Sequence, residues 1–172
     1  GMWSASNPYE AWLSAYVTGF LQDARDAGFA VPETLQKKAM SALLEQFQRS
    51  PGLQTRLPKL LRRDPQGNLV DSSEIEVVRM AHQRLSEAAH AGYILAREQK
   101  APLATLRTLH DEYRTNARSP LALIHLGLAL KLMGDEARAT VAIDDALKLA
   151  WGINPSASTA NRWGDWLGDY GS

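Results

Sequence analysis

The chain has 172 residues, of which 45% are hydrophobic and 22% charged, as expected for one soluble globular domain with a real core. Basic and acidic residues number 19 each, so the basic excess usual in nucleic-acid-binding proteins is missing and we expect no nucleic-acid partner. The absence of cysteine excludes disulfides, thiolate metal sites and thiol nucleophiles within the chain.

No apolar run reaches the length needed to span a membrane, and no signal-peptide pattern is present. Gly1 before Met2 is typical of a residue left after tag removal. We therefore expect a piece of a longer protein, whose targeting segment lies outside this sequence.

The first predicted elements are two helices over residues 10–27 and 32–48, which form a hairpin. Asn7 is placed to cap the first helix, Glu10 completes a capping box, and Gly28 ends the helix. The first helix also carries a broad apolar stripe, which we expect to lie in the core rather than on a contact surface. The stripe consists of Trp12, Leu13, Tyr16, Val17, Phe20, Leu21 and Ala24.

Residues 53–71 contain prolines and a Pro-Gln-Gly-Asn turn, and predict a loop without regular structure. A third helix is predicted over 73–99, where Ser73 and Glu76 form a capping box. Small and medium apolar residues repeat along it at helical spacing. They are Val78, Ala81, Leu85, Ala88, Ala89 and Ala96.

Three further helices are expected to start at Pro102, Pro120 and Asp135. The helix from Pro120 is apolar on most sides, which predicts a central position. Four side chains of the helix from Pro102 are expected to face the core. These are Leu103, Leu106, Leu109 and Tyr113. Short turns and a strand content near zero predict an all-α fold of antiparallel helix pairs over residues 1–152.

Residues 153–172 have a different composition from the rest of the chain. They are rich in glycine, serine and asparagine but contain Trp163, Trp166 and Tyr170. Because large aromatic side chains are seldom left in water, we expect this irregular tail to pack on a partner surface.

No residue is predicted to be catalytic, cofactor-binding or metal-binding. His82 and His90 are eight positions apart on one predicted helix, too far for a zinc-binding pair. His110 starts a His-Asp-Glu run that is typical of a polar surface. His125 shares a helix face with leucines, which favours a buried structural histidine over a ligand.

Two charged features are also interpreted as structural. Asp144 and Asp145 are adjacent on a predicted helix and therefore face apart, which is typical of a solvated face. The short basic run at 59–63 is followed at once by an aspartate and favours a solvated loop. No nucleophile elbow, P-loop or dinucleotide-binding glycine motif is present in the sequence.

Residues 121–147 match the small and large positions of one tetratricopeptide repeat, including Gly127 and Ala139. No second copy follows at the period of about 34 residues. A closely packed helical hairpin is therefore the favoured interpretation, and an independent tetratricopeptide-type binding module is the alternative.

Two separated blocks, 10–40 and 92–147, together with Asp169–Ser172, resemble the bacterial alpha-2-macroglobulins in the helical domain that carries their thioester. The first block resembles a Trp-Leu-Thr-Ala-Tyr-Val-like helix followed by a Gly-Tyr/Phe-x-Val-Pro turn. The second resembles Tyr-x-Leu-Ala-Arg, Ser-Pro-Leu-Ala and Gly-Asp-x-x-Arg-Ala segments. The first-block positions that carry the likeness are Trp12, Leu13, Ala15, Tyr16, Val17, Phe20, Leu21, Ala24, Gly28, Val31 and Pro32.

The resemblance implies that residues 1–152 are part of an α/α toroid, and that 153–172 lead to a further helix. It implies a structural part of an endopeptidase inhibitor that traps proteinases, with no enzymatic activity and no cofactor. The thioester motif contains cysteine and would lie outside this chain. The implied partners are other domains of the parent, target proteinases and a peptidoglycan synthase, and the implied location is the periplasm, with a lipid tether.

A helical-ring enzyme and an independent tetratricopeptide-type module are the alternatives to this interpretation. A helical-ring enzyme would need paired carboxylates about 5–9.5 Å apart, and no convergent acidic pair is visible in the sequence. An independent tetratricopeptide-type module would need no missing partner. A cut toroid would expose apolar helix faces, so the isolated chain is expected to self-associate.

Overall fold

The computed structural model describes residues 9–49, 61–63, 66, 69–71 and 74–152. The predicted helices are confirmed, and most of their ends agree within about two residues. In chain order the elements are α1 (Tyr9–Asp26), α2 (Glu33–Gln48), β1 (Leu61–Arg63), β2 (Leu69–Asp71), α3 (Glu74–Arg97), α4 (Leu103–Thr108), a π-helical turn (Leu109–Tyr113), a 3-10 turn (Arg114–Asn116), α5 (Pro120–Leu132) and α6 (Glu136–Ala150). The predicted aromatic tail at 153–172 lies outside the described residues.

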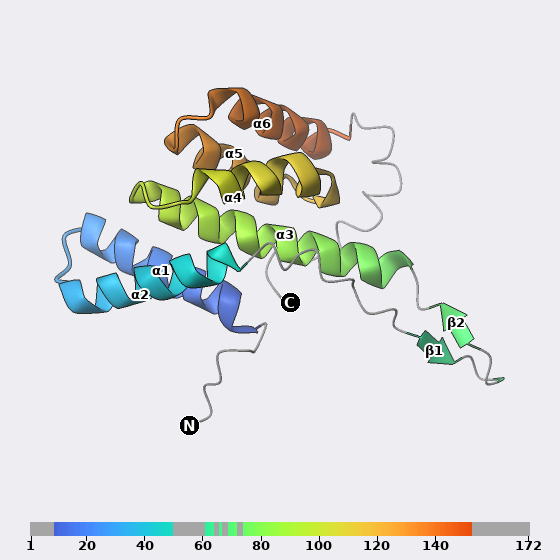
Figure 1. Cartoon of the computed structure of the whole chain (residues 1–172), viewed down its shortest axis with the longest axis horizontal. Helices are drawn as coiled ribbons and strands as arrows, with labels where there is room; N and C mark the ends of the chain where they lie inside the picture. Colours follow the sequence, from blue (N-terminus) through green and yellow to red (C-terminus); the bar gives the residue numbers. More distant parts are fainter. Residues whose placement is uncertain (1–8, 50–60, 64–65, 67–68, 72–73, 153–172) are drawn as a thin grey trace.

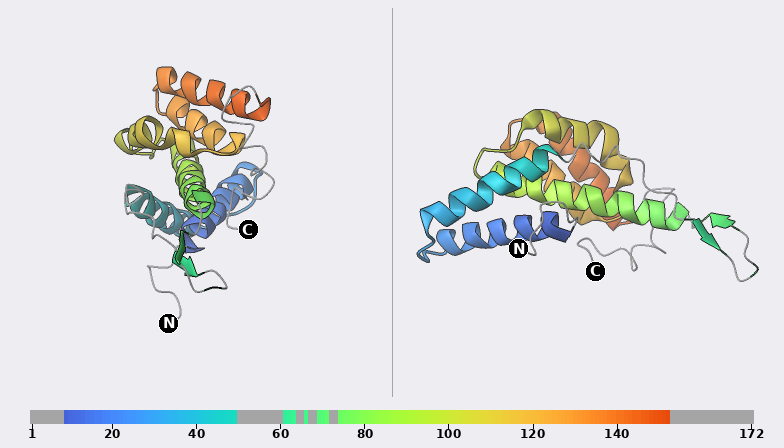
Figure 2. Two further views of the ribbon diagram at one scale, coloured as in Figure 1. Left: turned by 90° about the vertical axis from the view of Figure 1, so that its right-hand side faces the viewer. Right: turned by 60° about the horizontal axis from the view of Figure 1, so that its bottom comes forward.

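The central element is α3, a helix of 24 residues. The α1–α2 hairpin covers one side of it, and α4, α5 and α6 lie on the other (Figure 1). An end-on view shows the same order, with α3 between the two groups (Figure 2). The α5 helix contacts both α3 and α6, so α6 is the outermost helix on its side. The all-α architecture of antiparallel helix pairs is thus as predicted.

The core lies mainly around α3 and α5, where the sequence placed most of the apolar residues. Its largest fully buried apolar side chains are Leu43, Phe47, Leu85, Leu95, Leu106, Leu109, Leu123, Leu126 and Leu130. The central position predicted for the helix at Pro120 is confirmed, because six of its residues are buried, among them Gly127.

The α5–α6 hairpin is closely packed, as the spacing of small residues predicted. The buried residues of α6 are all alanines, which lets its axis approach α5. A Cβ added at Gly127 would lie 2.8 Å from Cδ1 of Ile143 and 3.2 Å from the backbone oxygen of Ala139. Glycine is therefore required at this crossing by the distance between the two helices.

The ends of α3 and α5 are tied together by one side chain. Gln99 follows α3 with φ of 58°, in the left-handed region that only a few per cent of non-glycine residues adopt. Its Nε2 donates to the carbonyl oxygen of Leu132, the last residue of α5, over 2.9 Å. Two residues later Gly134, with φ of 90°, reverses the chain toward α6.

The fourth predicted helix is not a single regular α-helix. It begins after Pro102 as predicted, but after six residues it widens into the π turn and then tightens into the 3-10 turn. Leu106 and Leu109 are buried, and Leu103 and Tyr113 are partly buried against the core, so the inward positions are confirmed. The spacing of apolar residues locates this inward face, but it does not distinguish an α-helix from a π-helix or a 3-10 helix.

A short pair of β-strands is another element that the sequence pattern missed among the described residues. Strands β1 and β2 pair antiparallel, with Leu61 opposite Asp71, within the segment expected to be a loop. It extends from the start of α3 away from the helices (Figure 1). Three-residue strands are too short to show a reliable alternating pattern, which is why they were not predicted.

Candidate interaction surface

The side of α1 that faces α3 consists of small and polar residues. Ala15, Thr18 and Gln22 are buried, and a Cβ at Gly19 would lie 2.9 Å from Cδ1 of Ile94. Thr18 satisfies its own hydroxyl by donating to the carbonyl of Ser14, one turn earlier. This face suits a close helix crossing, because small side chains leave room for the neighbouring helix.

The opposite side of α1 is apolar and exposed. Tyr16 and Phe20 keep 63% and 64% of their surface in contact with solvent, Val17 keeps 43%, and Leu13 is also exposed. We call these four residues the α1 outer face. The prediction that the apolar stripe lies in the core is therefore wrong for this part of it. Hydrophobic periodicity marked the stripe correctly, but the partner that would bury it is not among the described helices.

The charged side chains described in α1 lie near its C-terminal end and pair with the end of α3. Among the described side chains of α1 the charged ones are Asp23, Arg25 and Asp26, and each forms an ion pair with the end of α3. Arg97 contacts both aspartates, at 2.9 and 3.2 Å, and Arg25 contacts Glu98 at 2.7 Å. All three side chains remain largely exposed, at 71%, 40% and 53% for Asp23, Arg25 and Asp26. Because Asp23 follows Phe20 by three positions, it lies at the edge of the α1 outer face.

The outer face of α6 offers a comparison on the other side of the molecule. Val141 keeps 40% of its surface exposed and Leu147 is also exposed. These residues alternate with exposed Thr140, Asp144 and Lys148. Isolated apolar residues among polar ones are common on surfaces and need no partner. The prediction of a solvated face at Asp144 and Asp145 is confirmed for Asp144, whereas Asp145 is half-buried and pairs with Arg114.

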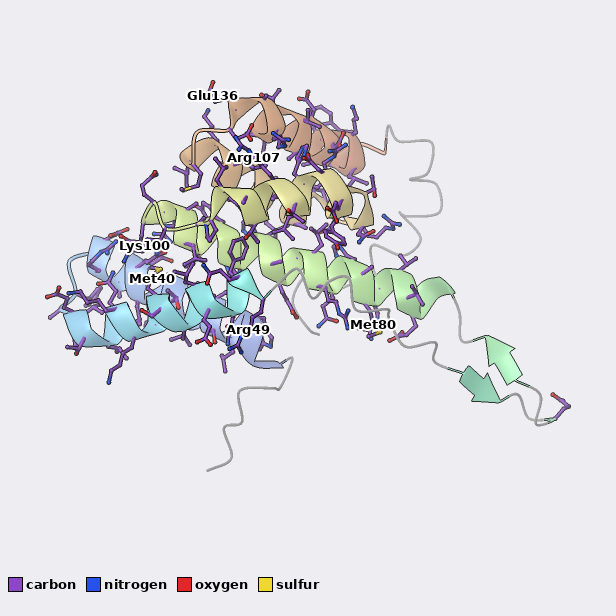
Figure 3. The ribbon with its side chains drawn as sticks, in the orientation of Figure 1. Met40, Arg49, Met80, Lys100, Arg107 and Glu136 are labelled. Carbon is purple, nitrogen blue, oxygen red and sulfur yellow. The ribbon has the colours of Figure 1, made fainter. Side chains whose placement is uncertain are left out.

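Ion pairs connect the α4 segment to α6. Asp135 accepts a hydrogen bond from the N–H of Arg138 at the start of α6, and its carboxylate lies 2.7 Å from Nε of Arg107. Arg138 also holds Asp111 of the π turn through two bonds, of 2.9 and 2.8 Å. Figure 3 marks Arg107 on α4, on the side of the molecule where α6 lies. These pairs fix the short α4 segment against the outermost helix.

The arginines of this network lower the pKa values of its carboxyl groups. Arg138, and then His110, hold the pKa of the Asp111 carboxyl well below its usual range. Arg107 has the largest effect on Asp135, whose pKa is also lowered. Both carboxyl groups are therefore charged at neutral pH, as a structural network requires.

The His-Asp-Glu run is only partly the exposed cluster that was predicted. His110 is buried, whereas Asp111 is exposed and lies 2.8 Å from Nδ1 of the histidine. Arg114 lies beside the His110 ring and donates to Asp145 of α6 over 2.8 Å. The π turn brings these side chains together, and no pattern in the sequence indicated that turn. Burial and ion pairing make this a structural cluster.

The other histidines stabilise the α3 side of the core. His82 is fully buried, and its Nδ1 accepts a hydrogen bond from the backbone N–H of Arg118 just before α5. His125 is half-buried rather than buried as predicted. Its ring stacks on His90 at 4.9 Å and on Tyr93 at 5.4 Å between centroids. Burial lowers the pKa of His90.

Within the described ranges, no group of three or more histidine, cysteine or acidic residues is arranged to hold a metal ion. The basic run at 59–63 lies outside the described side chains. No helix of the described segments is both long and apolar enough to cross a membrane. The α1 outer face is therefore the feature that most needs a functional explanation.

Comparisons with known proteins point to one family, although no protein-family model matches the chain. The chain is 36% identical over 171 residues to an alpha-2-macroglobulin of Xylella fastidiosa, an alignment that covers 99% of this chain but 9% of that protein. It also superimposes on native Escherichia coli alpha-2-macroglobulin with a TM-score of 0.65 and 34% identity, covering 100% of this chain and 9% of the solved one. The trypsin-activated form of the E. coli protein matches with a TM-score of 0.63 and 34% identity, over 86% of this chain and 9% of the other. The chain thus spans about a tenth of the length of the relatives it matches.

Proposed function

Because this chain belongs to the bacterial alpha-2-macroglobulin family, as a segment of a much longer protein, we propose that it is a structural part of an endopeptidase inhibitor that traps proteinases. The observation that carries the proposal is the alignment, which runs through nearly the whole chain at 36% identity. The trypsin-activated state of the E. coli relative supports a response to proteinases in the parent of this chain.

Within that parent, the segment contributes a wall of packed helices rather than reactive groups. Arg107 of α4 pairs with Asp135, the cap of α6, and Arg138 of α6 pairs with Asp111 of the π turn. The chain contains no cysteine for a thioester. We assign residues 1–152 to an arc of an α/α toroid, and 153–172 to the connection that follows it. The bond-forming centre, if the parent has one, then belongs to a different segment.

The proposed location of the parent is the periplasm, with a lipid tether to the inner membrane. The support for this is the bacterial family alone. Fractionation of cells that express the parent gene, with and without detergent, tests it. Recovery of the parent in the cytoplasmic fraction would contradict the proposed location.

The alternative of an independent tetratricopeptide-type module is not favoured by the structure. The match to the motif is confined to the α5–α6 hairpin with its close crossing at Gly127, and the family alignment extends far beyond it. The two hypotheses also predict different stabilities for the isolated chain. An independent module would be stable without the rest of a parent protein, whereas a segment of a larger domain would depend on it.

Inhibition by the full-length parent tests the proposed function. The parent is incubated with trypsin, and residual activity is measured on casein and on a small chromogenic peptide. A trap lowers cleavage of the protein substrate far more than cleavage of the peptide, because the small molecule still reaches the enclosed enzyme. Equal activity on casein with and without the parent, for trypsin and for elastase, would refute the proposal.

A matched pair of substitutions tests the structural role of this segment in the parent. Leu126 is fully buried in α5, so Leu126→Asp should abolish inhibition together with folding of the domain. Lys148→Ala changes an exposed residue of α6 and should leave inhibition within about twofold of the unmodified parent. Loss of inhibition in the second variant alone would indicate a direct contact with the proteinase.

A further inference from the structure

Three aromatic rings meet where α3 packs against α5. The His125 ring of α5 stacks on the His90 ring of α3 at 4.9 Å between centroids and on Tyr93 at 5.4 Å, with interplanar angles of 27° and 11°. All three residues are half-buried. We propose that the His90–His125 pair makes the contact between α3 and α5 sensitive to acid, because the two helices separate more readily once both rings carry a proton. This inference does not depend on the proposed function.

The pair lies at the junction between the two groups of helices. The α1–α2 hairpin packs on α3 and α6 packs on α5, so the contact between α3 and α5 joins the two groups (Figure 1). Histidine is the residue whose unperturbed pKa, about 6.5, lies between pH 5 and pH 8. Charge at this junction therefore changes in mildly acid solution, before ordinary carboxyl groups are protonated.

Two protonated rings would repel each other at this distance. A like charge so close disfavours the charged form of its neighbour, and the effect is larger where water is partly excluded. Burial acts in the same direction on one member, since it lowers the pKa of His90. In the unfolded chain each ring binds its proton independently. The stability that the neutral pair contributes is therefore complete above the unfolded pKa of about 6.5, and it declines as the pH falls below that value.

The charged groups nearest to the pair on α3 and α1 do not all act in this direction. Arg97 lies seven residues after His90 and is paired with Asp23 and Asp26 of α1. Glu87 lies three residues before His90, and burial raises the pKa of its carboxyl group. Because the folded chain takes up that proton more readily than the unfolded chain, Glu87 favours the folded state as the pH falls and opposes the histidines.

The other helices bring no described charge to the pair. On α5, the residues one turn before and after His125 are apolar. They are Leu121, Ala122, Leu128 and Ala129. The α6 helix meets α5 at Gly127, two positions from His125 and so on a different side of α5. In the same way, α2 and α4 meet α3 at Gly92, two positions from His90. The described charges that bear on the pair are thus those of α1 and α3.

Nuclear magnetic resonance of the histidine rings tests the interaction directly. The ring C–H signals of the 172-residue chain are followed from pH 8 to pH 5, in the unmodified protein and in His125→Phe. Phenylalanine keeps an aromatic ring against His90 and Tyr93 but cannot take up a proton. The midpoint of the His90 titration should rise by about 0.5 pH units or more in the variant, because the neighbouring charge is gone. An unchanged midpoint overturns the proposal.

Urea unfolding measures the consequence for stability. Between pH 7.5 and pH 5.5 the unfolding equilibrium constant of the unmodified chain should rise about three- to tenfold, because the folded pair binds fewer protons than the unfolded one. The rise should be smaller in His125→Phe, and in Glu87→Gln it should be at least as large as in the unmodified chain. No rise in the unmodified chain, or the same rise in His125→Phe, overturns the proposal.

Two variants complete the experiment. Asp135→Asn is the control, since Arg107 lowers the pKa of the Asp135 carboxyl group below its ordinary value of about 4, and the rise between pH 7.5 and pH 5.5 should equal that of the unmodified chain. If His125→Phe does not fold, His90→Phe removes the other titrating ring and should show the same reduced rise. A full rise in His90→Phe overturns the proposal.

Discussion

The side chain of Gln22 donates from Nε2 to the backbone carbonyl of Ile94, 2.9 Å away, and joins α1 to the end of α3. The N–H of Glu98, which would ordinarily reach that carbonyl, bonds instead to Leu95. Gln22 thus supplies the donor that the end of a helix leaves missing. A polar residue is buried on α1 for this reason, while apolar residues of the same helix face outward.

Replacing Gln22 by alanine should lower the free energy of unfolding by about 1–3 kcal/mol, because a buried carbonyl loses its partner. Urea unfolding of the 172-residue chain measures the change. Gln48→Ala, at an exposed position near the end of α2, is the control and should change the free energy by less than about 0.5 kcal/mol. Similar losses in the two variants would contradict the role of Gln22.

Two glycine-to-alanine substitutions should differ in their effect. At Gly127 the new methyl group meets Ile143 and the backbone of α6, so we expect a net loss of about 1–2 kcal/mol despite the better helix propensity of alanine. At Gly19 it meets only the side chain of Ile94, which can move, so the loss should be smaller. Thermal or urea unfolding gives the order, and a greater loss at Gly19 would be inconsistent with the close α5–α6 crossing.

The carboxyl groups of Asp111 and Asp135 should make the chain sensitive to acid. Their pKa values are lowered in the folded state, chiefly by Arg138 and by Arg107 respectively, so the unfolded chain binds protons more readily. Their stabilisation is complete above the unfolded pKa of about 4 and is lost as the pH falls through the lower native values. Urea unfolding between pH 7 and pH 2 should show this decline.

The variant Asp135→Asn measures how much of this loss of stability in acid comes from the carboxyl group of Asp135. It should flatten the dependence of the unfolding free energy on pH below about 4, because one of the shifted groups no longer titrates. Asp144→Asn changes an exposed residue of α6 and should leave the slope as it is. If both variants keep the full slope, Asp135 does not contribute as the structure indicates.

The isolated chain should associate through the α1 outer face when no parent protein covers it. Sedimentation velocity at increasing concentration is expected to show species larger than a monomer, and Phe20→Glu should shift them toward monomer. Val141→Glu, at the comparably exposed valine of α6, should have little effect. A strict monomer at every concentration for the unmodified chain would contradict this prediction.

The sequence by itself determined the helices and the core at their centre. Caps, proline starts and glycine ends depend on local backbone geometry, so the bounds of α1, α2, α3, α5 and α6 follow from short segments. Residues such as Leu106 and Leu126 were identified because a continuous apolar face in a central helix has little alternative to burial. The family resemblance also depended on the order of short motifs and needed no tertiary structure.

Only the tertiary structure decided which side of α1 is buried. Periodicity identifies an apolar stripe, but it does not specify whether the surface that covers the stripe belongs to the same chain. Close approach of α3 selected Ala15, Gly19 and Gln22 for the interior, since small side chains and one well-placed donor fit a narrow crossing better than Phe20 does. The burial of His110 was decided in the same way, by a π turn whose side chains meet partners distant in sequence.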